Sequence, residues 1–205
     1  SEYAYWEQWS AAALADQVRL PEDQAEAEPF TLADTDTVVF QLTEEETGTL
    51  LKQAHRAYNT EVNDLLLTAL GMMLYTWTGH ERSLINLEGH GRENILPDTD
   101  ISRTVGWFTS QYPVLLDIGR GHALSDRIKQ VKESLRHIPN KGMGYGIWRY
   151  WSESGQAIQQ ADVLNLGQHQ AFAEPQVSFN YLGQFDQELQ NSDIRMSPYS
   201  MGSVI

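Results

Sequence analysis

The amino-acid sequence predicts a layered α/β fold. Short apolar runs at residues 83–88, 109–118 and 177–182 have the length and composition of strands. Residues 61–78 and 123–138 instead carry apolar side chains every three or four positions, as on one face of a helix. Interleaved strands and helices pack as a sheet covered by helices. With 205 residues, 41% of them hydrophobic, the chain is long enough to bury a core.

The composition excludes several classes of function. The formal net charge of −14 argues against binding to nucleic acid or to an anionic membrane surface, because both would repel the chain. No run of eighteen apolar residues predicts a membrane-spanning helix. Cysteine is absent, which removes disulfides, thiolate nucleophiles and cysteine metal sites. This composition fits a reducing cytoplasm, where we expect the protein to work.

Residues 1–36 are predicted to form a helix and an acidic linker. An apolar stripe at helical spacing runs through residues 3–19, and Pro21 ends it. Residues 24–36 are acidic and contain a proline, as expected of a linker or surface loop. Native N-termini are usually polar and poorly ordered, so this aromatic start indicates a segment cut from a longer chain.

The first half of the remaining chain is predicted to hold three strands and two helices. Residues 38–42 predict a short strand. The sequence from Thr43 to Glu46 is a capping box that starts a helix. The helix over 61–78 is apolar around most of its circumference and should lie deep in the core. Strand 83–88 follows, and strand 109–118 contains Pro113, which predicts a sheet edge or a bend.

The second half is predicted to be less regular. A helix over 123–138 ends at Pro139, followed by a glycine-rich turn over 139–146 and a short aromatic segment over 147–151. The final strand is expected at 177–182. We therefore divide the chain into the N-terminal helix and linker, a lobe over 37–190, and a tail over 191–205 that contains little that could be buried.

Glu88 is the leading candidate for chemistry. It ends a buried strand and is followed by Gly89-His90-Gly91-Arg92, in which glycines on both sides of a histidine allow a sharp turn. Gathering a carboxylate, an imidazole and a guanidinium there costs stability, as functional sites do. The alternative is a structural turn in which Glu88 pairs with Arg92 or Arg103. These residues alone leave both interpretations open.

The sequence lacks the common motifs for cofactor binding, metal binding and nucleophilic catalysis. It has no dinucleotide fingerprint, no P-loop lysine and no histidine pair at metal-ligand spacing, so we expect no bound cofactor or metal. No serine stands in a nucleophile elbow, which leaves acid–base chemistry. Asn180 and Tyr181 end the last strand, where they could donate hydrogen bonds to an oxyanion or form an ordinary buried pair. Trp107 and Phe108 are expected to pack in the core.

Several motifs then follow one another in a known order. The sequence resembles the C-terminal half of an epimerization domain of a nonribosomal peptide synthetase, in the condensation-domain superfamily. Five signature blocks can be matched, namely Asp64–Gly71, Glu88–Glu93, Arg103–Pro113, Pro139–Gly146 and Phe179–Gly183. The sequence has Asp117 where the family usually has glutamate. It also lacks the family's first two blocks, which include the His-His-x-x-x-Asp motif.

This resemblance implies a fold similar to chloramphenicol acetyltransferase, in which two lobes, each a two-layer α/β sandwich with a mixed sheet, enclose a tunnel. The chain would be one such lobe. The implied activity inverts the L- to the D-configuration at Cα of an aminoacyl or peptidyl thioester during antibiotic-like peptide biosynthesis. An upstream peptidyl carrier domain presents the substrate on its 4′-phosphopantetheine arm, so the chain itself would bind no cofactor.

The resemblance also assigns roles to residues. Glu88 would be one acid–base group, and the second would come from the His-His-x-x-x-Asp motif of an N-terminal lobe, the expected partner. Asn180 and Tyr181 would position or stabilise the enolate, and Arg103 would orient Glu88. On its own the chain should then be inactive. The alternatives are a condensation domain that forms peptide bonds and a non-catalytic fragment that docks a carrier domain.

Overall fold

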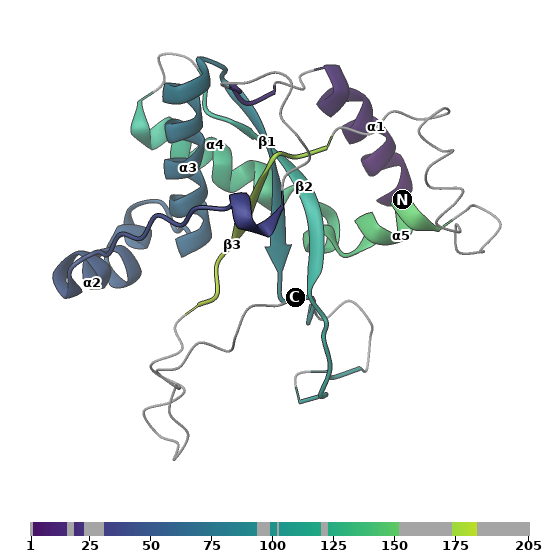
Figure 1. Cartoon of the computed structure of the whole chain (residues 1–205). Helices are drawn as coiled ribbons and strands as arrows, with labels where there is room; N and C mark the ends of the chain where they lie inside the picture. The colour runs from purple at the N-terminus through teal and green to yellow at the C-terminus, as the bar shows by residue number, and fades with distance from the viewer. Residues whose placement is uncertain are drawn as a thin grey trace.

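The structure is a computed structural model that describes residues 2–15, 19–22, 31–93, 99–101, 103–119, 123–151 and 174–183. It contains a small mixed sheet flanked by helices (Figure 1). The strands are β1 (Arg82–Gly89), β2 (Ser110–Asp117) and β3 (Val177–Asn180). The α-helices are α1 (Glu2–Ala15), α2 (Glu44–Lys52), α3 (Val62–Thr78), α4 (Leu124–Arg136) and α5 (Gly144–Tyr150). Three short 3₁₀ turns are η1 (Leu32–Asp34), η2 (Ala54–Ala57) and η3 (Pro139–Gly142).

Strand β1 is the centre of the sheet. It pairs antiparallel with β2 on one side and parallel with β3 on the other. Side chains alternate along β1, so that Ile85 and Leu87 are buried while Asn86 and Glu88 point to the opposite face. Pro113 lies in β2, an edge strand among those described, as its sequence predicted.

The main core lies between the sheet and helices α3 and α4. Leu67 and Leu74 of α3 meet Ile85 and Leu116 of the strands, and all four side chains are almost fully buried. Burying a leucine or isoleucine stabilises a fold by about 1.5–3 kcal/mol. Gly71 allows α3 to approach β2 closely, since a Cβ there would lie 2.6 Å from Ile118 Cδ1. The prediction of a deeply buried helix at 61–78 therefore holds for one face of α3, while its other face is half-exposed at Met73 and Trp77.

Helices α1 and α5 pack together on the other side of the strands, next to β2 (Figure 1). Trp6 of α1 is fully buried, and its ring centroid lies 5.0 Å from that of Tyr145 of α5 in an edge-to-face contact. This aromatic contact fixes α5 above the sheet.

Capping side chains stabilise the N-terminal ends of two helices. Thr43 and Glu46 form the predicted capping box at the start of α2. At the start of α3, Asp64 Oδ2 accepts a hydrogen bond from the backbone N–H of Glu61 at 2.8 Å. The same oxygen accepts two hydrogen bonds from the Arg136 guanidinium, each 3.3 Å long, which ties α3 to α4.

Two sequence predictions about secondary structure are wrong. Residues 38–42 form no strand, and Val38, Val39 and Phe40 are all more than three-quarters exposed. A strand needs a neighbour, and no described strand pairs with this segment. The glycine-rich turn predicted over 139–146 ends earlier, because after η3 the chain continues as helix α5, which includes most of the aromatic segment over 147–151. Glycines suggested a break there, yet Gly144 and Gly146 lie inside the helix.

The remaining elements match their predictions within a few residues, except that β3 ends at Asn180 rather than at residue 182. The predicted tail over 191–205 and most of the acidic linker lie outside the described residues. Among the described helices, none is both long and apolar enough to cross a membrane.

Candidate active site

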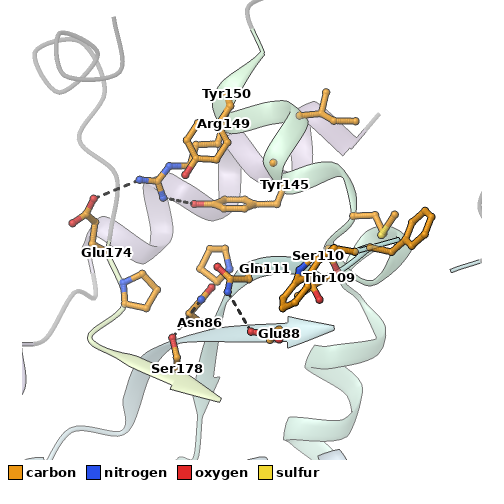
Figure 2. Close-up of a pocket in the computed structure, with 18 residues that line it drawn as sticks. Asn86, Glu88, Thr109, Ser110, Gln111, Tyr145, Arg149, Tyr150, Glu174 and Ser178 are labelled. Atoms are coloured by element: carbon orange, nitrogen blue, oxygen red, sulfur yellow. Dashed lines mark hydrogen bonds and ion pairs between the residues drawn. The ribbon is translucent and has the colours of Figure 1, made fainter. Parts of the chain in front are cut away.

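Glu88 lies near the end of β1, on the sheet face opposite the main core. The strand register places Gln111 of β2 and Asn180 of β3 directly beside it. Asn180 Nδ2 donates a hydrogen bond to Glu88 Oε1 at 2.8 Å, and Gln111 Nε2 donates one to Glu88 Oε2 at 3.3 Å. The second of these bonds is visible in Figure 2. Two amide donors from neighbouring strands thus hold the half-buried carboxylate.

The partners of Glu88 test the structural alternative for this turn, in which its carboxylate pairs with an arginine. Among the described residues no guanidinium forms an ion pair with its carboxylate, so the pairing with Arg92 or Arg103 is not observed. Amide donors orient a carboxylate but add no positive charge beside it. A carboxylate held in this way keeps free lone pairs with which to accept a proton.

A cavity of about 720 Å³ lies between this sheet face and α5. Figure 2 shows Glu88, Asn86, Gln111 and Ser178 on the sheet, with the α5 side chains opposite them. The loop before β2 adds the aromatic side chains of Trp107 and Phe108. The cavity therefore combines a carboxylate and neutral hydrogen-bonding groups with apolar surface, as small-molecule sites do.

The α5 side of this cavity is held by a polar network. Arg149 donates one hydrogen bond to the Tyr145 hydroxyl oxygen at 2.9 Å and another to Glu174 Oε1 at 3.4 Å (Figure 2). Burial raises the pKa of Tyr145, and the hydrogen bond from Arg149 partly opposes this effect. Tyr145 therefore stays a phenol at neutral pH, fixed by Arg149.

A second cavity, of about 360 Å³, also includes Glu88 in its lining. Several of its charged groups are paired with one another. Glu93 interacts with His90 Nε2 at 3.1 Å and with Lys141 Nζ at 3.2 Å. Burial and the nearby charge of Glu93 raise the pKa of Tyr112, which also lines this cavity, to about 12.

An unusual backbone turn joins the two cavities. Asn140, Lys141 and Gly142 all have positive φ angles, of 44°, 48° and 78°. Such conformations are strained for residues with a Cβ and are kept where the surroundings enforce them. At Gly142 a Cβ would lie 2.1 Å from Tyr112 Cγ, so the backbone passes directly over that ring. This contact determines where α5 begins above the first cavity.

The structure brings together only some of the predicted site residues. Glu88 and Asn180 are in direct contact. Tyr181 is half-buried next to Asn180, and Arg103 is exposed, but neither lines the two cavities around Glu88. Sequence reasoning missed Gln111, although an antiparallel pairing of the two predicted strands would have placed a side chain opposite Glu88.

The prediction that Trp107 packs in the core is wrong, since 89% of its surface is exposed. Trp107 instead lies at the wall of the large cavity, and Phe108 is half-buried under the guanidinium of Arg92. Composition alone does not distinguish a core aromatic residue from one that lines a cavity. Among the described residues no cluster of three or more metal-binding side chains occurs.

An α/β lobe with a hydrogen-bonded carboxylate beside a large, partly polar cavity has the features of an enzyme site. Comparison with known proteins gives the family. The Condensation domain family matches residues 1–204, and the chain belongs to it.

The relatives of the chain belong to nonribosomal peptide synthetases. The chain is 55% identical over 200 residues to a mycosubtilin synthase polypeptide of Bacillus subtilis, covering 98% of the chain and 7% of that protein. It is 47% identical over 196 residues to surfactin synthase subunit 2 of Bacillus subtilis (strain 168), covering 96% and 5%. The chain thus spans a small fraction of the length of these curated relatives.

A solved structure extends the comparison to the fold. The epimerization domain from the third module of tyrocidine synthetase B matches with a TM-score of 0.73 and 42% identity, over 90% of this chain and 39% of that one. The predicted fold class is thereby confirmed, since the chain has the helices and mixed sheet of this kind of α/β sandwich.

Proposed function

We propose that the chain is part of an epimerization domain, which inverts the L- to the D-configuration at Cα of an aminoacyl or peptidyl thioester. The substrate would be carried on the phosphopantetheine arm of a nonribosomal peptide synthetase carrier domain. The observation that carries the proposal is the Glu88 carboxylate, oriented by Asn180 and Gln111 and bordering a cavity of about 720 Å³. Identity of 42% to a solved epimerization domain supports it.

The chemistry requires a base that removes the Cα proton and an acid that returns one on the opposite face. A thioester acidifies that proton, and the resulting enolate is stabilised by hydrogen-bond donors at its oxygen. Glu88 would serve as one of the two groups, because its carboxylate is held by neutral amides and borders the cavity. The second group would come from an N-terminal lobe that carries the His-His-x-x-x-Asp motif.

The remaining roles follow from position. Asn180 donates to Glu88 itself, which favours a positioning role over direct contact with the enolate. Tyr181, the next residue, would offer its hydroxyl to the enolate oxygen once the second lobe and the substrate are present. Arg103 is exposed and lines neither cavity around Glu88, so the position of its side chain adds no support to the role that the resemblance assigns to it. No cofactor of this chain is needed, because the thioester activates the Cα proton.

Peptide-bond formation is the second candidate, since the family that matches is named for condensation. The two reactions give different products from the same starting material. An L-aminoacyl carrier domain and an amine acceptor would be mixed with the chain and an N-terminal lobe, and the released material analysed by chiral chromatography. Our proposal predicts a mixture of D- and L-amino acid. Amide product without inversion would overturn it.

A further inference from the structure

The loop over 103–109 forms one wall of the large cavity, yet it buries little apolar surface of its own. Val105 is 99% exposed and Trp107 is 89% exposed. Phe108 and Thr109 complete the part of the loop that lines the cavity. Because so little of its apolar surface is buried, other contacts must hold this loop in place.

Arg92 provides such contacts. Its Nη1 donates hydrogen bonds to the backbone carbonyls of Ile101 at 2.7 Å and Thr104 at 2.8 Å, and its Nη2 donates to that of Gly106 at 3.1 Å. The guanidinium carbon lies 4.3 Å from the centroid of the Phe108 ring. One planar cation therefore binds three carbonyl groups and an aromatic face, a combination that lysine cannot reproduce.

The backbone on either side of Arg92 is fitted to the same loop. Gly91 has a φ of +64°, and a Cβ there would lie 1.5 Å from the carbonyl oxygen of Phe108. The N–H of Arg92 donates to His90 Nδ1 at 3.0 Å, while His90 Nε2 faces Glu93 at 3.1 Å. These contacts fix the direction in which Arg92 leaves the end of β1.

We propose that Arg92 is a positioning residue that clamps the loop over 103–109 in place as the aromatic wall of the Glu88 cavity. Its effect on catalysis rests on the proposed function, whereas its effect on the loop does not. Because Glu88 and the wall border the same cavity, the clamp would set how the acyl chain of a bound thioester lies relative to the carboxylate. Arg92 itself does not touch Glu88 among the described contacts.

Limited trypsin digestion tests the clamp without any activity assay. Arg103 is exposed within the loop, and cleavage after it can be followed by mass spectrometry. We expect Arg92→Gln to speed this cleavage at least about tenfold, since two carbonyl groups of the loop and that of Ile101 just before it lose their hydrogen bonds to a charged group. Arg92→Lys should restore only part of the protection. Phe108→Leu removes the ring contact alone and should give a smaller increase.

Two controls separate loop opening from general unfolding. Arg82→Gln removes a different, exposed arginine at the start of β1, whose Nε lies 3.0 Å from Asp117 Oδ2, and should leave cleavage after Arg103 unchanged. Cleavage after Lys132, a largely buried side chain within α4, should stay slow in every variant. Unchanged cleavage after Arg103 in Arg92→Gln, or equal acceleration at Lys132, would overturn the clamp.

Kinetics with a carrier-bound thioester and an N-terminal lobe test the catalytic consequence. A displaced wall should raise KM at least about fivefold while the pH profile of kcat stays that of the wild type, because Arg92 does not exchange protons with substrate. A shifted pH profile would contradict a positioning role. Faster cleavage after Arg103 in Arg92→Gln, in a protein whose wild type never epimerizes, would support the clamp and reject the proposed function.

Discussion

Replacing Gly142 with alanine should destabilise the protein through one identifiable contact. The residue has a φ of +78°, a conformation that costs a residue with a Cβ about 1–2 kcal/mol. The new Cβ would also lie 2.1 Å from Cγ of Tyr112, a residue that is only 7% exposed and whose ring cannot swing away freely. Forced overpacking of this kind costs about 1–3 kcal/mol. Together, Gly142→Ala should lower the free energy of unfolding by about 2–5 kcal/mol.

Gly146 provides the matched control, because it is a second glycine of the same segment with neither constraint. It lies inside α5, and a Cβ there would meet no atom within 4 Å. Gly146→Ala should raise the free energy of unfolding by about 0.5–1 kcal/mol, because alanine favours the helix. Urea denaturation followed by circular dichroism measures both variants. Free energies of unfolding that agree within about 0.5 kcal/mol between the two variants would refute the reasoning.

Three further predictions concern the site and its supports. Asn180→Ala should slow epimerization about tenfold, measured as initial rates, with little change in stability because Asn180 is exposed; an unchanged rate would argue against positioning. Asp64→Ala should lower the free energy of unfolding in urea by about 2–4 kcal/mol, because Arg136 loses its buried partner and Glu61 its cap; a loss below about 1 kcal/mol would contradict this. Burial raises the pKa of Tyr112 to about 12, above the usual 10. The Tyr112 hydroxyl therefore loses its proton at a lower pH in the unfolded protein than in the folded one. The contribution of Tyr112 to the free energy of unfolding should therefore be constant below about pH 10 and fall by up to about 2–3 kcal/mol between about pH 10 and 12, so that over this range the wild type should lose that much more stability than Tyr112→Phe.

The sequence predicted correctly those features that depend on residues close together along the chain. The capping box at Thr43 and the apolar spacing of residues 61–78 depend on neighbours along the chain, and both predictions were confirmed. Pro113 predicted an edge or a bend, because proline cannot donate to a second strand, and β2 lies at an edge of the described sheet. Residues 38–42 have strand-forming side chains, but a strand also needs a partner that composition does not reveal.

The site was predictable in part for the same reason. Glu88 and Asn180 end strands that the resemblance and the apolar pattern both identify, and β1 and β3 bring their side-chain atoms to 2.8 Å. Predicting the contact of Gln111 with Glu88 would have required the register of two strands. Predicting the role of Arg92 would have required the path of the loop that it binds. Both depend on contacts between residues distant in sequence. The exposure of Trp107 likewise depends on the cavity that forms only in the folded chain.

The central claim is that Glu88 moves the Cα proton, and hydrogen exchange tests it most directly. A carrier-bound L-aminoacyl thioester in D₂O would be incubated with the chain and an N-terminal lobe, and deuterium at Cα measured by mass spectrometry. Glu133→Gln, a change at an exposed glutamate of α4, is the control. We expect the wild type and Glu133→Gln to exchange equally and Glu88→Gln to be slowed at least about a hundredfold. Exchange at the wild-type rate in Glu88→Gln would contradict the account.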